Sequence, residues 1–564
     1  MAYDLKSVTM PRLAGRSLSL VAALLENGLT GRLLGGRLAA DTGIGVLRAF
    51  PVDEDPTFVP RLPFGGPAAT PADRPDLAAL LERTAGWTRP AGSPHATIAE
   101  YHAAYRAGTT DPLAVAERAL EAIAASDRGA IPLRAFLSVN RDDVHAQARA
   151  SAARWAAGTP LGPLDGVPMC VKDEMDQAGH PTTLGTPALA RGPAPDDAGG
   201  VTGLRRAGAL LLGKTNMQEI GMGVYGTNAH YGHARNPINP AYHTGGSSSG
   251  TAAAVQAGIV PVGVGADGGG SIRIPAAFCG TVGLKPTFGR VSEFAAATLC
   301  WSVGYAGPIA TTARDALLAF AAMAGPDPRD PGSLLQPPLR FDALDRDDLG
   351  DLTLGICRPW FAHASREIVE ACDAQVAAFR RRGAKVRDVE IPDLDAARVA
   401  HVVTITGEAL SSMRRRMGDH RAVFGPETRI VLAIASQFSA ADYVAAQRVR
   451  TRCMAHMARA LDGVDAIVTP ATGVTAPLIA AGTESGVSDV TVATEIMRFA
   501  FLTNLTGHPS ISFPVGHAAN GMPIGLQATA HAWREDTCLR LAAAAERDVP
   551  RRAGALRFPS YADA

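Results

Sequence analysis

Two serine-rich segments and one lysine carry the groups in this chain that are best suited to chemistry. Ser247 lies in the segment GGSSSG, and Ser271 follows three glycines in the segment DGGGSIRIP. Lys172 ends the apolar segment VPMCVK and is one of five lysines among 54 basic residues. A serine hydroxyl needs a base before it can act as a nucleophile. A lysine can be that base where burial lowers its pKa, whereas an arginine stays charged.

The glycines before Ser271 have a physical use beside a reactive serine. Gly268, Gly269 and Gly270 allow a tight turn that aims successive backbone N–H groups at one point, as an oxyanion hole requires. Ser247 and Ser271 lie 24 residues apart and bracket one helix and one strand, so the chain can fold back and bring them together. These residues favour a serine hydrolase site, and a glycine-rich turn with a capping serine is the alternative.

Two shorter motifs overlap the same segments. GVGADG fits G-x-G-x-x-G after an apolar strand, which is the fingerprint of a dinucleotide-binding turn. The helix that should follow is weakened by two more glycines and by Pro275, and the expected acidic residue downstream is not evident. GSSSG fits the nucleophile elbow with Ser248, but the proline-rich segment NPINPAYHTG stands where that motif needs a strand. Both motifs have less support than the lysine and the two serines.

The elements around these segments alternate between helix and strand. VTGLRRAGALLLGKTNM and SSSGTAAAVQAGIVPVGVGAD each predict a helix followed by a buried strand, and VDAIVTPATG predicts a further strand. This alternation predicts an α/β fold with a largely buried sheet. We assign residues 96–550 to the catalytic domain, residues 1–95 to an N-terminal extension and residues 551–564 to a C-terminal tail.

The N-terminal extension begins with apolar residues at helical spacing. A helix over residues 17–38 would align Leu18, Val21, Leu24, Leu25, Leu29, Leu33 and Leu38. We expect it to pack on its own protein or on a second subunit, and contact with a membrane surface is the alternative. The following segment, FPVDEDPTFVPRLPFGGP, is rich in proline and glycine and predicts an extended arm.

Composition excludes several classes of function. Hydrophobic residues make up 47% and charged residues 19%, the formal net charge is zero, and no basic tract favours a nucleic-acid partner. The seven cysteines are scattered without metal-ligand spacing, which is typical of reduced thiols in a cytoplasm. The first residues lack the order of a signal peptide, and no apolar run approaches the ~20 residues that span a bilayer. We therefore expect a cytoplasmic protein, with peripheral membrane association as the alternative.

The segments DGVPMCVKD, GGSSSGTAAAVQAG and GADGGGSIRIPAAFCGTVGLKPT resemble the signature of the amidase signature family of serine hydrolases. This resemblance implies that Ser271 is the nucleophile, Lys172 the base, and Ser247 the bridging serine on a cis peptide bond. It also implies an oxyanion hole formed by the N–H groups of Gly268, Gly269, Gly270 and Ser271. The fold it implies is a large mixed, twisted β-sheet of about eleven strands covered by α-helices. Many members are homodimers, and neither a metal nor an organic cofactor is expected.

Further residues around the triad of Lys172, Ser247 and Ser271 match the family pattern. Asp267 and Arg273 match an acidic and basic pair that shapes the glycine loop, and Ser248 is a second candidate for loop support. Met222 is a candidate substrate-binding residue. One departure is Ala266, which stands where the family often has threonine. Alanine lacks the hydroxyl that threonine would place beside the triad, and we expect this difference to have a modest effect on the site.

The resemblance extends to one branch of the family. LLGKTNMQEIGMG, NPINPAYHTGGSSSG, TEIMRFAFLTNLTGHPSISFPVG and GMPIGLQ look most like the fatty acid amide hydrolases of plants, and the arginine-rich composition suggests a bacterial relative. This implies hydrolysis of N-acyl amides with a hydrophobic acyl group. An amidase for aryl acylamides, peptide amides or acyl-homoserine lactones is one alternative, and a component of an amidotransferase complex is another.

Overall fold

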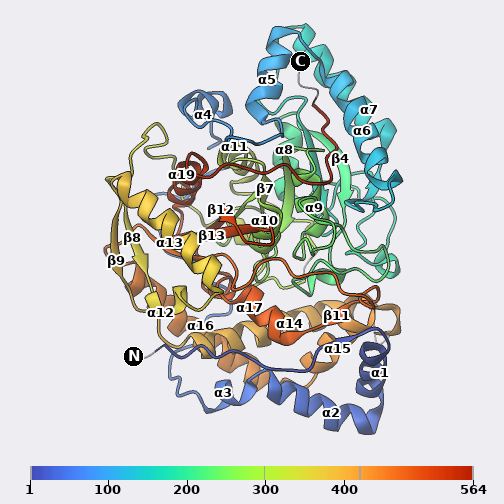
Figure 1. Cartoon of the computed structure of the whole chain (residues 1–564), viewed down its shortest axis with the longest axis vertical. Coiled ribbons are helices and arrows are strands. Elements are labelled where there is room, and N and C mark those ends of the chain that lie inside the picture. The colour runs from blue at the N-terminus through green and yellow to red at the C-terminus, as the bar shows by residue number, and fades with distance from the viewer. Residues whose placement is uncertain (1–2, 298, 418–420, 562–564) are drawn as a thin grey trace.

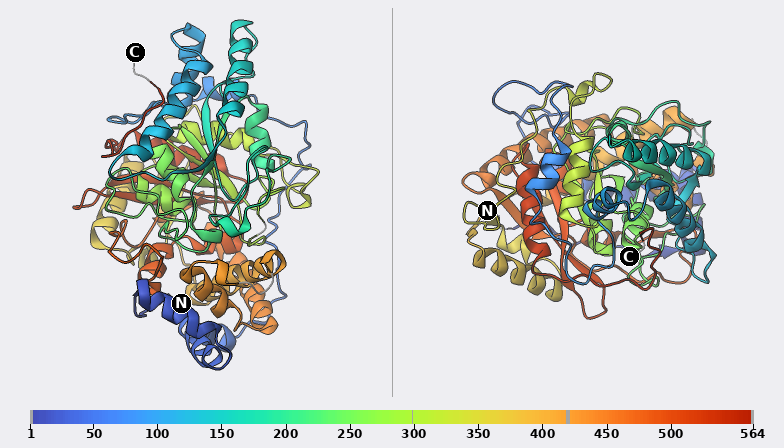
Figure 2. Two further views of the ribbon diagram at one scale, coloured as in Figure 1. Left: turned by 90° about the vertical axis from the view of Figure 1, so that its right-hand side faces the viewer. Right: turned by 90° about the horizontal axis from the view of Figure 1, so that it is seen from above.

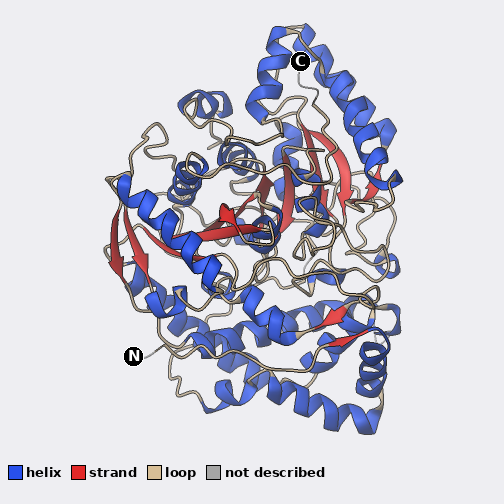
Figure 3. Ribbon diagram, viewed as in Figure 1, coloured by secondary structure: helices blue, strands red, loops and turns tan. Residues whose placement is uncertain are grey.

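The computed structural model describes residues 3–297, 299–417 and 421–561 of the chain. Within these ranges, eleven strands form one mixed sheet in the order β2-β4-β3-β5-β7-β6-β12-β13-β10-β8-β9, with helices on both of its faces (Figures 1 and 3). The predicted α/β class and sheet of about eleven strands are confirmed. The strands are β2 (Phe136–Val139), β3 (Pro168–Lys172), β4 (Leu210–Thr215), β5 (Val262–Ala266), β6 (Val282–Lys285), β7 (Ala306–Ala310), β8 (Thr353–Ile356), β9 (Lys385–Asp388), β10 (Ala466–Pro470), β12 (Ser510–His517) and β13 (Pro523–Ala530).

The sheet has parallel strands where helices connect them and antiparallel strands in its middle. β3 pairs in parallel with β4 and β5, and β8 pairs in parallel with β9 and β10. The central strands from β5 to β10 pair antiparallel. Parallel neighbours need a crossover connection. The strands β3, β4 and β5 therefore all end at the same edge of the sheet.

The helices surround the sheet and extend below it. Those that flank the sheet are α4 (Leu77–Arg83), α5 (Ile98–Ala107), α6 (Pro112–Arg128), α7 (Arg141–Ala156), α8 (Gly199–Arg206), α9 (Ser249–Gln256), α10 (Arg273–Cys279), α11 (Ala313–Met323), α12 (Arg358–Phe361), α13 (Arg366–Arg381) and α19 (Glu535–Glu546). Those below it are α1 (Gly15–Glu26), α2 (Gly28–Asp41), α3 (Ile44–Ala49), α14 (Leu394–Met417), α15 (Pro426–Ala435), α16 (Ala440–Leu461), α17 (Val490–Met497) and α18 (Phe501–Thr506). Figure 2 shows this lower layer beneath the sheet in side view.

Two glycines inside β5 let helix α9 approach the sheet closely. A Cβ atom on Gly263 would lie 2.5 Å from Thr251 Cγ2, and one on Gly265 would lie 3.1 Å from Ser248 Oγ. The other face of β5 carries Val262 and Val264, which belong to the main apolar core. The glycine face of the strand thus lies close to α9, and the valine face is buried in the core.

The N-terminal extension packs against α14–α16 through three short helices. α1 and α2 lie on α15, and α3 lies on α14 and α16. The sequence predicts one helix over residues 17–38, but the structure has two, because Asn27 ends α1 and its side chain accepts a hydrogen bond from the Leu29 N–H group at the start of α2. Leu18 and Leu25 are buried, whereas Leu29 and Leu33 remain exposed. No helix in the described ranges is long and apolar enough to cross a membrane.

Two irregular segments connect these layers. The arm between α3 and α4 runs along α16, where Arg450 donates to the Phe58 carbonyl at 2.7 Å. The C-terminal tail returns over α5, where the Tyr101 and Ser560 hydroxyls lie 2.8 Å apart. A two-residue strand, β1 (Leu13–Ala14), pairs with β11 (Val487–Ser488) and joins the N-terminal extension to the segment before α17.

Candidate active site

The adjacent strands β3 and β5 bring Lys172 to the serine segments. Cys170 and Val171 pair with Gly263 and Val264, so Lys172 at the end of β3 reaches the end of β5. There its side chain is 1% exposed. Its Nζ atom lies 2.8 Å from Ser247 Oγ and 3.4 Å from the Ala266 carbonyl oxygen. The peptide bond between Gly246 and Ser247 is cis.

The two serine segments meet through their backbones. The Ser248 N–H group donates to the Ser271 carbonyl at 3.3 Å, and the Ser248 hydroxyl donates to the Ala266 carbonyl at 3.2 Å. Ser271 is 8% exposed and lies at the wall of a cavity. Both serines belong to the described chain, and no hydrogen bond joins their hydroxyls in this arrangement. The structure thus places Lys172 and Ser247 in direct contact and holds Ser271 beside them through the loop.

A buried ion pair holds the glycine loop from below. The Asp267 carboxylate accepts from Arg273 Nε and Nη2 at 3.0 Å each and from the Gly270 N–H group at 2.6 Å. Asp267 and Arg273 are both fully buried. Burial raises the pKa of Asp267, but the Arg273 charge and the hydrogen bonds outweigh it and hold the pKa below its ordinary value. The carboxylate is therefore ionised and fixes the path of the loop.

The glycine loop leaves several backbone donors available. Gly270 has a φ of +118°, which a residue with a Cβ rarely adopts. Its N–H group is occupied by Asp267. Within the described chain, the N–H groups of Gly268, Gly269 and Ser271 have no hydrogen-bond partner, so three of the four predicted oxyanion donors are unoccupied. Such donors beside a serine can stabilise the oxyanion of an acyl transfer reaction.

His401 on α14 supports the same loop from the other side. Its Nε2 atom lies 2.8 Å from the Gly268 carbonyl oxygen. Because a carbonyl only accepts, Nε2 carries the hydrogen in this contact. Burial lowers the pKa of His401 to about 4, so the ring is neutral at pH 7. His401 thus fixes the carbonyl of the first glycine in the loop.

An apolar cavity of about 200 Å³ opens beside Ser271. It lies between the glycine loop, α14, α15 and α17. Most of its wall is aliphatic, with Met222, Val224, Val402, Ile405, Val431, Val487, Val490, Ala493 and Met497 among the lining residues. Glu427 also lies in the wall, where it accepts from Gln218 Nε2 at 2.6 Å and Thr227 Oγ1 at 2.9 Å. Burial raises the pKa of Glu427 to about 8.

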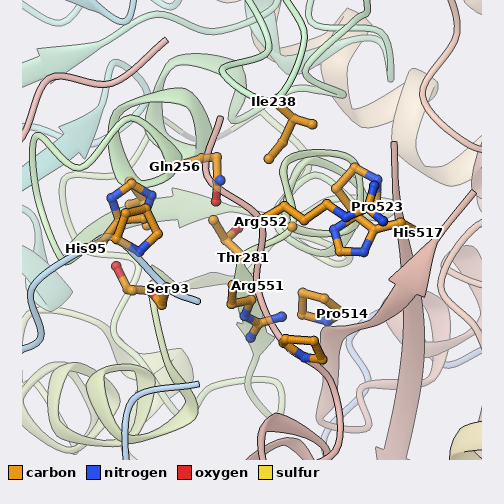
Figure 4. Close-up of a pocket in the computed structure, with 15 residues that line it drawn as sticks. Ser93, His95, Ile238, Gln256, Thr281, Pro514, His517, Pro523, Arg551 and Arg552 are labelled. Atoms are coloured by element: carbon orange, nitrogen blue, oxygen red, sulfur yellow. The ribbon is translucent and has the colours of Figure 1, made fainter. Parts of the chain in front are cut away.

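A second hollow, shown in Figure 4, lies away from Ser271. Ser93, His95, Thr281, Arg551 and Arg552 are among its lining residues. It encloses about 20 Å³, which is room for about one water molecule. Of these two hollows, the cavity beside Ser271 is the one with room for an organic substrate.

Three residues at the site were not found from the sequence. Glu174 Oε2 lies 2.6 Å from Lys172 Nζ, His401 holds the glycine loop, and Glu427 lines the cavity. A carboxylate two positions after the lysine in VKDEMD is a signal that could have identified Glu174. His401 and Glu427 lie on distant helices and have no local signal. Among the described residues, no group of three or more His, Cys, Asp or Glu side chains is placed to share a metal ion.

Comparison with known proteins gives a consistent result. The family model described as Amidase matches residues 115–539. The chain is 37% identical over 576 residues to a fatty acid amide hydrolase of Arabidopsis thaliana, covering 97% of this chain and 94% of that protein. It is 37% identical over 443 residues to a subunit of the glutamyl-tRNA(Gln) amidotransferase of Anaeromyxobacter sp. (strain K), covering 74% of this chain and 89% of that protein. The native peptide amidase from Stenotrophomonas maltophilia has a similar structure, with a TM-score of 0.70 at 30% identity, covering 82% of this chain and 98% of that one.

Proposed function

Because this chain belongs to the amidase signature family of amide-hydrolysing enzymes, we propose that it cleaves N-acyl amides with a long apolar acyl group. Ser271 is the nucleophile, Ser247 is the bridging group and Lys172 is the base. The observation that carries the choice of substrate is the aliphatic cavity of about 200 Å³ that ends at Ser271. An acyl chain buried there gains about 0.8 kcal/mol for each CH₂ group removed from water.

The first half of the reaction forms an acyl-enzyme. Neutral Lys172 accepts the hydroxyl proton of Ser247, and Ser247 accepts the proton of Ser271 as Ser271 Oγ bonds to the carbonyl carbon. The π electrons of the carbonyl move to its oxygen, where the N–H groups of Gly268, Gly269 and Ser271 can donate to the oxyanion. The contact of 2.8 Å between Lys172 Nζ and Ser247 Oγ supports this route.

The second half releases the two products. The Lys172 proton returns through Ser247 to the amine nitrogen as the C–N bond breaks, because an amine anion is a poor leaving group. A water molecule then loses its proton to the same base and attacks the acyl carbonyl. The carboxylic acid leaves, and Ser271 regains its proton.

The comparisons also support the lipid-like substrate. The match to the fatty acid amide hydrolase of Arabidopsis thaliana covers 97% of this chain, whereas the match to the amidotransferase protein covers 74%. The longer match includes most of the N-terminal extension. That extension contributes β1, which pairs with β11, and the β11 residues Val487 and Ser488 form part of the cavity wall.

A panel of amides that share one small amine tests the proposed substrate. We expect kcat/KM to rise from acetyl through octanoyl to dodecanoyl amides, by up to about fourfold for each added CH₂ group. Filling the cavity with Val431→Trp should lower kcat/KM for the long chains and leave the acetyl amide nearly unchanged. Val444→Trp makes the same change at an exposed position on α16 and serves as the control.

Covalent labelling tests the assigned nucleophile. A fluorophosphonate should label the wild type once, and Ser271→Ala should abolish both labelling and hydrolysis. Labelling that persists in Ser271→Ala would remove Ser271 from this role. Equal rates across all acyl lengths, or a preference for aryl acylamides or peptide amides, would refute the lipid-like substrate and leave the amidase activity in place.

A further inference from the structure

Lys172 has a third partner in addition to Ser247 and the Ala266 carbonyl. Glu174 Oε2 lies 2.6 Å from Lys172 Nζ, and the two side chains are 11% and 1% exposed. The neighbouring residue, Asp173, lies 3.3 Å from Lys214 instead. The acidic residues after β3 are thus divided between two buried lysines, and Glu174 is the one at the triad.

Gly221 lies beside this contact. A Cβ atom on Gly221 would lie 3.6 Å from Ser247 Oγ and 3.7 Å from Glu174 Oε2, and its φ of +70° favours glycine. The carboxylate and the bridging hydroxyl therefore lie against the same patch of backbone, close to Lys172. Because both side chains are largely buried, the charge of Glu174 is screened far less here than it would be at the surface.

The three partners of Lys172 determine where its lone pair points. An ammonium group has three N–H donors, and a neutral amine has two donors and one lone pair. The Ala266 carbonyl and the Glu174 carboxylate have no hydrogen to donate, so a neutral amine would turn its two N–H groups toward these two oxygens. The hydroxyl of Ser247 is the one partner that can donate to the lone pair. The lysine is thus oriented toward the proton that it must accept.

We propose that Glu174 is a positioning residue for Lys172, which aims the lone pair of the lysine at Ser247 and acts as the counterion of the ammonium formed during acylation. The proposal rests on the proposed function, because it gives Lys172 the role of base. A carboxylate beside the amine favours the protonated lysine. Removing this carboxylate should therefore change the pH dependence of the reaction.

Other titratable and charged groups surround this pair. Glu293 and Cys300 in the loop before β7 and Arg416 on α14 interact with it directly. The same neighbourhood contains Asp176 after β3, Asp330 after α11, Glu408 on α14, and the ion pairs Asp173–Lys214 and Asp267–Arg273. Burial and the nearby carboxylates of Asp330, Glu174 and Glu408 raise the pKa of Glu293 well above its ordinary value. Glu293 makes a matched control for Glu174, because its carboxyl group lies near Glu174 but is not among the three partners of Lys172.

Two substitutions separate the charge of Glu174 from its orienting contact. Glu174→Gln removes the charge but keeps an oxygen that can accept from Lys172. In a plot of kcat/KM against pH, the part of the curve that rises with pH is the ascending limb. We expect Glu174→Gln to move this limb to lower pH by about one to three units, the shift typical of a close opposite charge. Glu174→Met removes the acceptor as well. Its ascending limb should move in the same direction, and its maximal kcat/KM should be about ten times lower than that of Glu174→Gln. Glu293→Gln should leave the limb in place.

The rate of fluorophosphonate labelling at each pH gives a second reading of the same limb. If Glu174→Gln does not fold, Glu174→Asp replaces it, and the limb should then move part of the way because the shorter side chain moves the carboxylate away. A folded Glu174→Gln or Glu174→Asp enzyme with the wild-type limb would overturn the proposal. An equal shift in Glu293→Gln would do the same. A wild-type enzyme that hydrolyses no amide refutes the proposed function, whereas an active enzyme with an unmoved limb refutes the role of Glu174 alone.

Discussion

Replacing Asp267 with asparagine tests whether a buried carboxylate holds the oxyanion donors in place. Asp267 accepts from the N–H groups of Gly270 at 2.6 Å and Ile272 at 3.0 Å, from Arg273 at 3.0 Å and from Asn504 at 2.9 Å. Asparagine has nearly the same shape, but its NH₂ group would face donors where an oxygen now accepts. Arg273 would also be left buried without a counterion.

The expected loss of stability follows from this ion pair. Removing one partner of a buried pair costs about 3–5 kcal/mol. With an unfolding entropy of about 2.1 cal/mol/K for each residue, the 564-residue chain should lose about 3–4 °C of Tm. Because the pKa of Asp267 is lowered in the fold, its contribution is complete above the ordinary pKa of 3.8 and is lost as the pH falls through the folded value. The wild type should therefore lose stability below about pH 4 more steeply than Asp267→Asn.

The expected loss of activity follows from the loop. Removing one oxyanion donor typically lowers kcat by about 10²–10³-fold, and the N–H groups of Gly268, Gly269 and Ser271 all depend on the path that Asp267 fixes. We expect kcat for a dodecanoyl amide to fall at least about 100-fold with little change in KM. The fluorophosphonate labelling rate should fall in parallel, because the phosphonate oxygen uses the same donors.

Asp315→Asn provides the matched control. Asp315 is also fully buried and accepts from the Ile98 N–H group at 2.8 Å and from Thr312 Oγ1 at 2.7 Å. Burial raises its pKa to about 7, so asparagine replaces a group that is already half protonated at neutral pH. Asp315→Asn should leave kcat unchanged. Wild-type kcat in Asp267→Asn would refute the positioning role, and an unchanged Tm would refute the energy assigned to the ion pair.

Three further substitutions give distinct results. Lys172→Ala should lower kcat/KM by about 10²–10⁴-fold, most of all at neutral pH, and near-normal rates would exclude the lysine as base. His401→Leu removes the hydrogen bond to the Gly268 carbonyl and should lower kcat by about tenfold at constant KM, which steady-state kinetics on the dodecanoyl amide will measure. Because the pKa of Glu427 is raised from 4.5 to about 8, its carboxyl group contributes stability below pH 4.5 that is lost as the pH rises through about 8. Glu427→Gln should therefore raise the Tm relative to the wild type at pH 9 but not at pH 4, and equal melting curves at pH 9 would show that Glu427 stays neutral there.

The sequence could place Lys172 near the two serine segments because these residues lie in a few continuous segments. Lys172 ends β3, and the segment from Gly245 to Arg273 contains α9, β5 and the glycine loop. Local rules of turn, strand and helix formation are enough to place these residues near one another. The partners supplied by α14 and α15 could not be predicted in this way. His401 lies 133 residues from Gly268, and only the packing of the lower layer brings it to the loop.

The N-terminal extension shows where a rule based on apolar spacing fails. On α2 the buried residues are Gly31, Gly35 and Ala39, whereas Leu29 and Leu33 face outward. A Cβ atom on Gly35 would lie 3.1 Å from the Gln437 side chain, so the small residues allow close approach to α15 and its end. Close backbone approach, rather than hydrophobic area, determines which face of this helix is buried.

The charge balance at the site argues for a neutral substrate. The buried ion pair of Arg273 with Asp267 leaves the glycine loop itself without net charge. At the cavity wall, burial keeps His401 unprotonated and Glu427 mostly protonated at pH 7. A charged substrate would lose its hydration in this cavity without gaining a counterion. An apolar acyl chain has no such hydration to lose. During the reaction, negative charge develops at the carbonyl oxygen and positive charge at Lys172, where backbone donors and the Glu174 carboxylate are already in place.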